Sequence, residues 1–398
     1  MRASRGITLC FFLSLVGIGL SSYLAFLHFG LQRGELLGGP ACGTGAFNCH
    51  AVTAGPWGAF LGMPLALWGI LGYAVVFALS LLGQQSAEWA DHTLTCVFLL
   101  AAVFLVIDLV LFFLMVFVIR LYCLFCLLTY ALNASLLVAA GRSLSYPWPQ
   151  TAARFGAALG TLTPSRQRPA ARMFWGIVLL AVWAVAGLHG ATTYLSRGTF
   201  GSLRKQLREY LTKQPRVTID VTGDPSMGPA NASLQIIEFS DFLCPACQRS
   251  FKLNAIMLAN HRHDARFIFK HYPLDTSCND KVSRTVHPGA CQVAAASECA
   301  HLQGKFWPFH DLVFEAAPHY NVMGIDEDVK HLGLDMAQFG ACMDSGQGLV
   351  AVKRDIAAGS GMGVVSTPTY LLNGVPISGG LNPSMFEDFV AVLKESGS

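Results

Sequence analysis

The chain has 398 residues, of which 53% are hydrophobic and only 13% are charged, and its formal net charge is +3. Soluble proteins are about 25% charged, so this composition excludes a protein that is soluble throughout. The small net charge, without a basic patch rich in aromatic residues, gives no indication of a nucleic-acid partner.

The shortage of charge is confined to the first half of the chain. Residues 1–195 hold nine Arg, no Lys and four acidic residues, whereas residues 196–398 hold eighteen basic and twenty acidic residues. We therefore expect a membrane-embedded part followed by a soluble domain. The twelve cysteines, several of them in pairs, favour an oxidising compartment.

Five apolar runs are long enough to cross a bilayer, which takes about 20 helical residues. They cover residues 7–29, 63–82, 96–119, 121–140 and 173–194. The first run is longer than the apolar core of a signal peptide, so we expect it to remain in the chain as a helix.

The arginines predict the orientation of these spans. Residues 141–172 carry five Arg and no acidic residue, and Arg2 and Arg5 precede the first span. Both segments are expected in the cytoplasm. With five spans, the C-terminal half, the loop 30–62 and the turn at 119–122 then lie outside it.

Residues 141–172 also contain four prolines, so we expect little packed structure there. Leu203, Leu207 and Leu211 recur every four residues and predict a short amphipathic linker helix over 202–213. From residue 215 onward, strands and helices alternate. Residues 234–239 form one strand, and residues 367–374 contain another that ends in an Asn-Gly hairpin turn.

Cys244 and Cys247 form a Cys-Pro-Ala-Cys motif shortly after the first of these strands. Cys244 is expected at the first turn of a helix, where unpaired N–H groups and the helix dipole stabilise a thiolate, the reactive form. Cys247, one turn later, can close a disulfide with it. Thr367-Pro368 fits a cis-proline that packs beside this disulfide and presents its backbone to an extended substrate.

Four further cysteines follow the motif: Cys278, Cys291, Cys299 and Cys342. They allow three pairings. Sequence proximity favours Cys278–Cys291, which leaves Cys299 to pair with Cys342, and we expect both as structural disulfides; buried free thiols are the alternative. Zinc at Cys244 and Cys247 would need a second closely spaced pair, so we expect no metal site.

Residues 215–396 resemble the thioredoxin superfamily, specifically its DsbA-like branch of bacterial thiol oxidases. The matching segments are GDPSMGPANASLQIIEFSDFLCPAC, FKHYPL, QGKFWPFHDLVFE and VVSTPTYLLNG. The resemblance implies an inserted helical subdomain, with Cys244 as the exposed nucleophile and Cys247 as the buried resolving thiol. It also implies that Glu238 is a buried acid that relays a proton when Cys247 is attacked or released; alternatively, Glu238 only ends a strand.

Two more cysteine pairs belong to the membrane part. Cys123 and Cys126 are expected one helical turn apart on one face of the fourth span, and Cys42 and Cys49 lie in the loop before the second span. Residues 1–140 resemble the vitamin K epoxide reductase family: two loop cysteines precede Gly62-Met63-Pro64, and CLFCLLTYALN follows in span four. The chain departs from the family at one point. Members commonly have a Ser shortly after the second loop cysteine, which would donate a hydrogen bond to the quinone, whereas this chain has Ala54-Gly55-Pro56-Trp57. Thr53 is the candidate to replace that Ser.

The two resemblances imply a relay of electrons. Reduced exported proteins pass electrons to Cys244/Cys247, then to Cys42/Cys49, then to Cys123/Cys126 and finally to a quinone, ubiquinone or menaquinone. Cys126 and Tyr130 are expected to contact the quinone, and packing is the alternative role of Tyr130. Asp108, an acid within the third span, is expected to make a hydrogen bond inside the bundle.

The predicted protein is therefore a membrane thiol oxidase of the bacterial inner membrane. Its fold class is a four-helix quinone-binding bundle with a fifth linking span, followed by an α/β thioredoxin fold. The expected boundaries are a membrane domain at 1–140, a cytoplasmic loop at 141–172, a span at 173–194, a linker at 195–214 and a thioredoxin domain at 215–398. A reductase or isomerase with reversed flow and a tethered, non-enzymatic chaperone are the alternatives.

Overall fold

The computed structural model describes residues 2–32, 47–85, 87–164, 169–317 and 319–395. The chain forms two compact units, Met1–Ser202 and Leu203–Ser398.

The first unit holds the membrane helices. Five helices of the described chain are long and apolar enough to cross a membrane, and each overlaps one predicted span: Ala3–Leu31, Leu65–Gly83, Trp89–Ile119, Leu124–Ser143 and Pro169–Tyr194. The prediction of five spans is therefore confirmed. The elements that contain them are α1 (Arg2–Gln32), α3 (Leu65–Gly83), α4 (Ala87–Phe113) with the π-helical turn η3 (Leu114–Ile119), α5 (Leu124–Ser143) and α7 (Pro169–Lys213).

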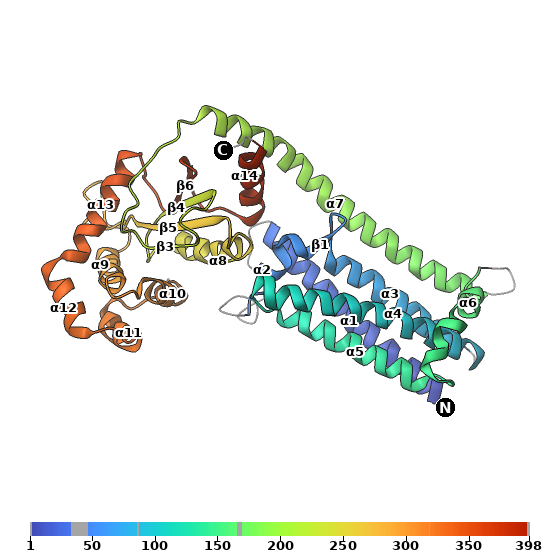
Figure 1. Ribbon diagram of the computed structural model, residues 1–398. Coiled ribbons are helices and arrows are strands. Elements are labelled where there is room, and N and C mark those ends of the chain that lie inside the picture. The colour runs from blue at the N-terminus through green and yellow to red at the C-terminus, as the bar shows by residue number, and fades with distance from the viewer. Residues whose placement is uncertain (1, 33–46, 86, 165–168, 318, 396–398) are drawn as a thin grey trace. The chain divides into compact units, whose positions relative to one another are not determined.

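Helices α1, α3, α4 and α5 pack side by side as a bundle (Figure 1). Glycines let them approach closely. A Cβ on Gly17 of α1 would come within 2.4 Å of the Tyr73 ring, and one on Gly83 of α3 within 2.3 Å of the Thr93 hydroxyl. Such close packing is what holds helices together in lipid, where there is no hydrophobic force between them.

A chain of polar side chains crosses this bundle. The Tyr73 hydroxyl donates to Asn133 Oδ1 at 2.7 Å, and Asn133 Nδ2 donates to Asp108 Oδ2 at 2.8 Å. All three residues are buried. Polar groups at membrane depth need partners within the protein, so the hydrogen bond predicted for Asp108 is confirmed.

Short elements connect α1 to α3 within the described residues: α2 (Cys49–Ala54), the 3-10 turn η2 (Pro56–Gly58) and the antiparallel strands β1 (Ala59–Phe60) and β2 (Met63–Pro64). Asn48 begins α2, because its side-chain oxygen accepts from the Ala51 N–H at 2.9 Å. His28 Nδ1 lies 3.1 Å from the Thr53 carbonyl and so ties α1 to the end of α2.

The expectation of little packed structure in 141–172 is wrong. This stretch contains the 3-10 turn η4 (Trp148–Gln150) and the helix α6 (Thr151–Thr161), and Ala158 and Leu162 are buried against the bundle. Trp175 Nε1 also donates to the Leu162 carbonyl at 2.7 Å. The prolines stand at helix boundaries, where they are tolerated, and do not prevent the helix between them.

The linker is also different from the prediction. Helix α7 runs without interruption from Pro169 to Lys213, so the fifth span and the predicted linker helix are one helix. The last residues of α7 belong to the second unit, where the Tyr210 hydroxyl donates to the Pro376 carbonyl at 2.7 Å.

The second unit is built on a five-stranded sheet with the order β3-β5-β4-β6-β7. The strands are β3 (Ser226–Met227), β4 (Leu234–Ser240), β5 (Ala265–His271), β6 (Thr369–Leu372) and β7 (Val375–Ser378). Strands β4 and β5 are parallel, and the other pairs are antiparallel. The predicted Asn-Gly turn joins β6 to β7, with φ of 43° at Asn373 and 84° at Gly374.

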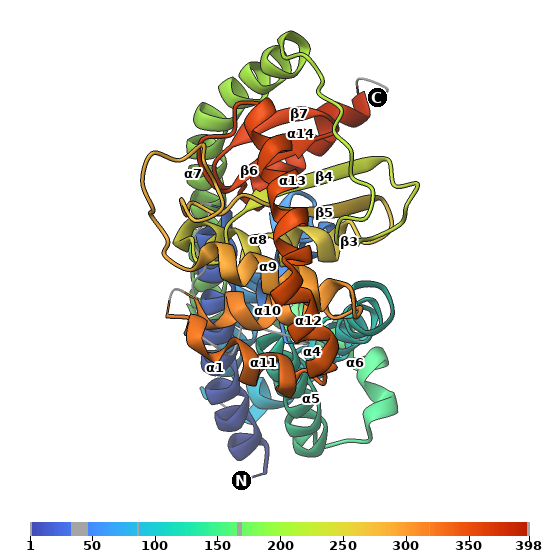
Figure 2. The ribbon, with the colours of Figure 1, turned by 90° about the vertical axis from the view of Figure 1, so that its left-hand side faces the viewer.

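Helices α8 (Pro245–Asn260) and α14 (Pro383–Glu395) pack against the sheet. A helical subdomain is inserted between β5 and β6, as predicted (Figure 2). It comprises α9 (Ala290–His301), α10 (Phe306–Ala316), the 3-10 turn η5 (Val322–Gly324), α11 (Ile325–His331), α12 (Met336–Ser345) and α13 (Gln347–Gly361). The predicted fold class, membrane helices followed by an α/β domain with a helical insertion, is confirmed.

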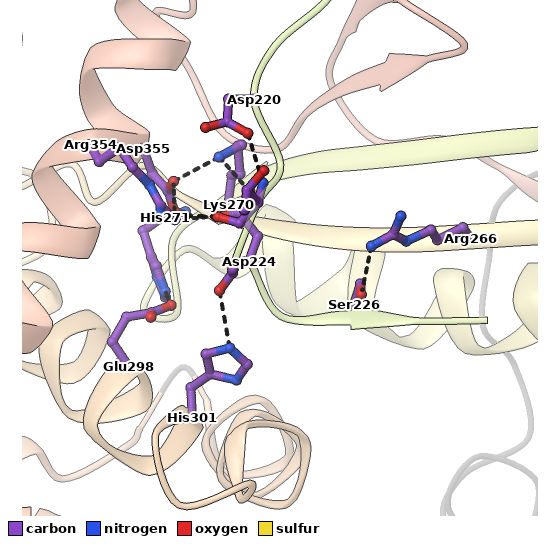
Figure 3. A network of polar contacts seen from close by, with 12 residues as sticks. Asp220, Asp224, Ser226, Arg266, Lys270, His271, Glu298, His301, Arg354 and Asp355 are labelled. Carbon is purple, nitrogen blue, oxygen red and sulfur yellow. Dashed lines mark hydrogen bonds and ion pairs between the residues drawn. The ribbon is translucent and has the colours of Figure 1, made fainter. Parts of the chain in front are cut away.

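A buried ionic network ties the subdomain to the sheet (Figure 3). Lys270 of β5 is 1% exposed, and its Nζ lies 2.6 Å from Asp224 Oδ2 and 2.8 Å from Asp355 Oδ1. Arg354 also bonds Asp224, and the His271 N–H donates to Asp355 Oδ2 at 3.0 Å. Burial raises the pKa of Asp224, and the neighbouring charge of Asp355 adds to that effect. Lys270 therefore holds two carboxylates together that would otherwise repel each other.

Replacing Lys270 by Met should destabilise the second unit by about 3 kcal/mol or more, because it removes the one buried cation that both carboxylates share and leaves them only the half-exposed Arg354. Pulse proteolysis of the full chain across a urea series measures this change. The control is Lys281→Met, which removes an exposed lysine whose only described ion pair, with Asp280, is itself exposed. Equal urea midpoints for the two variants would contradict the proposed contribution of the ionic network to the free energy of unfolding.

Candidate functional site

Cys244 and Cys247 lie at the start of α8, where the sequence predicts them. Cys244 is the N-cap residue, Pro245 occupies the first helical position and Cys247 lies in the first turn. Proline is well suited to this position because its missing N–H would have no helical partner there. Cys247 is fully buried, and Cys244 is 6% exposed. The expectation of an exposed Cys244 is therefore wrong in degree: only a small part of it reaches solvent.

The two thiols differ sharply in acidity. A hydrogen bond from Cys247 lowers the pKa of Cys244 to about 6, helped by Thr367 and by the backbone N–H groups of Cys247 and Ala246. Burial, together with the neighbouring Cys244, raises the pKa of Cys247 well above its ordinary value. At neutral pH the first sulfur is therefore largely a thiolate and the second remains protonated.

The Thr367–Pro368 peptide bond is cis, as the sequence predicts. It follows α13 and leads into β6, next to the thiol pair. Cys244 Sγ lies 3.6 Å from the Thr367 carbonyl oxygen. The backbone before Pro368 is thus within reach of whatever binds at Cys244.

Glu238 lies within β4, paired with Tyr370 of β6, and is 3% exposed. Asn254 Nδ2 donates to Glu238 Oε2 at 2.5 Å, and the Tyr370 hydroxyl donates to Asn254 Oδ1 at 3.0 Å. Burial raises the pKa of Glu238 to about 7. The Glu238 charge in turn raises the pKa of Cys247, so the two groups interact across the interior.

Two residues of the site were missed by sequence reasoning. Asp241 Oδ2 lies 2.7 Å from His287 Nδ1, and the Asp241 side chain is fully buried. The Asp241 hydrogen bond raises the pKa of His287, against the effect of burial, and the charges of Asp241 and Cys244 add to it. The only signals in the sequence are an acid three residues before Cys244 and a histidine between Cys278 and Cys291.

The remaining cysteines of the second unit form two disulfides, Cys278–Cys291 and Cys299–Cys342. This is the pairing that the sequence favours. The second disulfide joins α9 to α12 within the helical subdomain. The first closes the loop that carries His287.

In the membrane unit, Cys123 and Cys126 form a disulfide at the start of α5. Cys123 is the N-cap residue, and its Sγ accepts from the Cys126 N–H at 3.1 Å. The prediction that both lie on one helical face is wrong for Cys123, which precedes the helix. Arg120, with φ of 58°, ends η3 and turns the chain into this position.

Cys49 lies beside this pair. Phe47 and Tyr122 form a parallel bridge, and the Asn48 N–H donates to the Tyr122 carbonyl at 2.9 Å. Cys123 directly follows Tyr122, Cys49 comes two residues after Phe47, and both cysteines are fully buried in one apolar cluster. Cys42 lies outside the described residues.

The same cluster contains Cys126, Tyr130, Phe125 and Tyr23. The Tyr23 and Phe125 rings lie against each other at a tilt of 59°, with their centroids 4.7 Å apart. Tyr130 lies one turn after Cys126 in α5 and is half-buried. The Thr53 hydroxyl donates to the Cys49 carbonyl at 2.8 Å, so in this structure its hydrogen is used within α2.

In a comparison with known protein families, each of the two units contains a segment that matches a family model. Residues 8–140 match the family model described as the vitamin K epoxide reductase family, and residues 220–395 match a thioredoxin family model. The chain thus carries a vitamin K epoxide reductase domain on its first four spans. A thioredoxin domain follows, separated from it by a fifth span.

Among curated proteins, the chain is similar to the Na(+)/H(+) antiporter NhaA of Herminiimonas arsenicoxydans. The two are 31% identical over 164 residues, or 40% of this chain and 24% of that protein. NhaA 3 of Salinispora tropica is 28% identical over 158 residues, 40% of this chain and 23% of that protein. The chain spans about a quarter of the length of these relatives.

Among solved structures, BdbD from Bacillus subtilis is 21% identical, with a TM-score of 0.38, and the match covers 46% of this chain and 98% of that one. A thioredoxin-like oxidoreductase from Silicibacter pomeroyi is 20% identical, with a TM-score of 0.38, and the match covers 44% and 94%. For alpha-DsbA1 of Wolbachia pipientis the values are 16%, 0.38, 45% and 96%.

Glu238→Gln tests the burial of this acid through the pH dependence of stability. The folded pKa of about 7 exceeds the ordinary value of 4.5. The stability gained from the bound proton is therefore complete below pH 4.5 and is lost as the pH rises through 7. We expect the variant to be more stable than the wild type at pH 8, by roughly 2–3 kcal/mol, and equally stable near pH 4.

Pulse proteolysis in urea at both pH values measures this difference. Glu315→Gln, which removes an exposed glutamate of α10, is the control. If Glu238→Gln showed no pH-dependent gain over that control, Glu238 would not bind the proton assigned to it.

Proposed function

We propose that the chain is a membrane thiol oxidase that makes disulfides in exported proteins and passes the electrons to a quinone. One observation carries the proposal: a vitamin K epoxide reductase domain and a thioredoxin domain share one chain, and each places a cysteine pair at the start of a helix. A helix N-terminus favours the thiolate on which disulfide exchange depends.

The first exchange takes place at Cys244. A substrate thiolate attacks the Cys244–Cys247 disulfide, a mixed disulfide forms at Cys244, and Cys247 leaves and takes up a proton. The second substrate thiol then releases the oxidised product and leaves Cys244 as a thiolate. The low pKa of Cys244 supports this direction, because a stable thiolate is a good leaving group and makes the disulfide strongly oxidising.

The reduced thioredoxin domain is re-oxidised through the membrane thiols. Cys244 attacks the Cys42–Cys49 disulfide, and Cys49 then attacks Cys123 of the third pair. The shared cluster of Cys49 and Cys123 supports the second of these exchanges. Each exchange moves two electrons and conserves the number of disulfides, so a terminal acceptor must remove the electrons from Cys123 and Cys126.

The residues around Cys126 fit a quinone as that acceptor. After reduction of the Cys123–Cys126 disulfide, Cys126, Tyr130 and Phe125 combine a thiol, a phenol and an aromatic ring in an apolar cluster, which suits a flat, apolar ring with polar oxygens. A bound quinone accepts the two electrons and two protons that disulfide formation releases. Cys126 and Tyr130 would hold it, with the phenol as hydrogen-bond donor.

The five spans support a position in the bacterial cytoplasmic membrane, and the arginines of α1 and of 141–172 support a cytoplasmic N-terminus. The thioredoxin domain then faces the oxidising side, where reduced exported proteins are its partners. A reductase or isomerase with reversed flow would form no quinol, and a tethered chaperone would show no redox turnover at all.

The purified protein, given a reduced dithiol peptide and a quinone, should form one quinol for each peptide disulfide. Cys126→Ser should lower steady-state turnover at least about 100-fold, because electrons cannot leave the third pair. The soluble domain should still oxidise one equivalent of peptide. Cys96→Ser, a buried cysteine of α4 in the main bundle core, is the control and should retain turnover. Normal turnover of Cys126→Ser would refute the assignment.

Cys247→Ser should trap the transfer between the domains. Serine cannot displace Cys244 from a mixed disulfide, so a covalent link from Cys244 to Cys42 should accumulate and be found by peptide mapping. A link from Cys244 to Cys49 or Cys123 would show that the order of the relay is different.

A further inference from the structure

A histidine outside the Cys-Pro-Ala-Cys motif contacts the buried acid Asp241, which stands three residues before the reactive Cys244. His287 belongs to the loop between β5 and α9, 43 residues after Cys244 in the sequence. Its Nδ1 is 2.7 Å from Asp241 Oδ2, and its side chain is 15% exposed. Asp241 belongs to the turn that begins α8, because its carbonyl accepts from the Cys244 N–H at 3.1 Å.

The loop holds His287 firmly in this position. The N–H groups of Val286 and His287 donate to the Leu274 carbonyl at 2.8 and 3.2 Å. The Gly289 N–H donates to Asp275 Oδ2 at 3.0 Å. The Cys278–Cys291 disulfide joins a residue before Val286 to a residue after Gly289, and so closes the loop that contains His287. A histidine fixed by so many backbone bonds keeps its place when the charge beside it changes.

Asp241 brings a negative charge close to Cys244, and that charge needs a partner. Its carboxylate is fully buried and also accepts from the N–H groups of Leu243 and Leu274, both at 2.8 Å. An isolated buried carboxylate beside the thiol would oppose ionisation of Cys244. A proton on His287 neutralises the carboxylate and removes this opposition.

The thiol and the histidine influence each other. The Asp241 hydrogen bond raises the pKa of His287, and the charge on Cys244 raises it further. Such an interaction is reciprocal: if ionised Cys244 favours the proton on His287, then the proton on His287 favours ionised Cys244 by the same free energy.

We propose that His287 is a redox-linked proton site that sets the charge balance of the Cys244 thiolate through Asp241. This inference rests on the proposed thiol–disulfide function and adds a residue to its machinery. His287 acts as a positioning residue, since it touches Asp241 and not the sulfur.

The proton balance of the step is as follows. Two electrons from a substrate dithiol reduce the Cys244–Cys247 disulfide; Cys247 takes one proton, and Cys244 remains a thiolate. The new negative charge raises the fraction of molecules in which His287 carries a proton taken from solvent. When the pair is re-oxidised, Cys247 loses its proton, and the fraction of His287 that is protonated falls back to its earlier value.

Other charged and titratable groups lie near His287, in its own loop and at the start of α8. Asp275 lies in the same loop, and despite its burial the N–H groups of Ser277 and Gly289 hold its pKa below its ordinary value. Asp241 and Cys244 face His287 from the start of α8. Lys281 and Arg284 of the loop are exposed.

The test measures the reactivity of Cys244 in the full-length protein. The reduced protein in detergent is alkylated with iodoacetamide between pH 4 and 9, and trypsin releases residues 217–249, which contain Cys244 and Cys247 as their only cysteines. The wild-type rate at Cys244 should have its midpoint near pH 6. His287→Gln should raise that midpoint and slow alkylation at pH 5 by about fivefold to tenfold.

Two comparisons separate this effect from a loss of structure. His263→Gln, an exposed histidine of the same domain, should match the wild type. The double variant Asp241→Asn/His287→Gln should return the midpoint toward the wild-type value, because the uncompensated carboxylate is gone. In glutathione buffers, His287→Gln should shift the Cys244–Cys247 equilibrium toward the disulfide by the same factor.

The proposal is overturned if His287→Gln and the wild type have the same midpoint, or if the double variant is as slow as the single one. The outcome does not depend on quinone turnover. If the wild type formed no quinol, the proposed function would be refuted, but the alkylation result would still decide the role of His287.

Discussion

The hydrogen bond between Cys247 and the Cys244 thiolate is the interaction on which the chemistry of the thioredoxin domain depends. It places one proton on the buried sulfur and leaves the charge on the sulfur at the helix N-terminus. The charge therefore always develops where N–H groups can stabilise it. The buried sulfur also interacts with the charge of Glu238, which raises the pKa of Cys247, and burial raises the pKa of Glu238 itself to about 7.

The membrane domain uses a similar arrangement of sulfur in a different solvent. Cys123 and Cys244 are both N-cap residues, and Cys126 and Cys247 both lie in the first turn that follows. In the bilayer, however, every polar group needs a partner within the protein. The hydrogen bonds from Tyr73 through Asn133 to Asp108 meet this need for three buried polar side chains of α3, α5 and α4. The cluster around Cys49, Cys123 and Cys126 consists mainly of apolar and aromatic side chains.

Much of this organisation could be predicted because it depends on local sequence. Apolar runs define the spans, Asn373-Gly374 defines the hairpin, and a motif that follows a strand defines the thiol pair. Predictions failed where packing decides the result. The prolines of 141–172 stand at helix ends, so α6 forms between them, and α7 continues through Gly198 and Gly201 although glycine disfavours helices. Cys244 lies in one buried cluster with aromatic residues of the inserted subdomain, such as Phe306 and Phe309, which are more than 60 residues away in the sequence.

The contact between Asp241 and His287 could not be found from the sequence for a topological reason. Strands β4 and β5 are parallel, so their carboxyl ends leave the sheet at the same edge. Asp241 follows β4 directly, and Leu274 and the His287 loop follow β5, which brings three segments to one carboxylate. The charge around Cys244 is thus set by residues outside the Cys-Pro-Ala-Cys motif. It follows that two domains with the same motif can differ in thiolate stability according to the loop that the sheet brings against it.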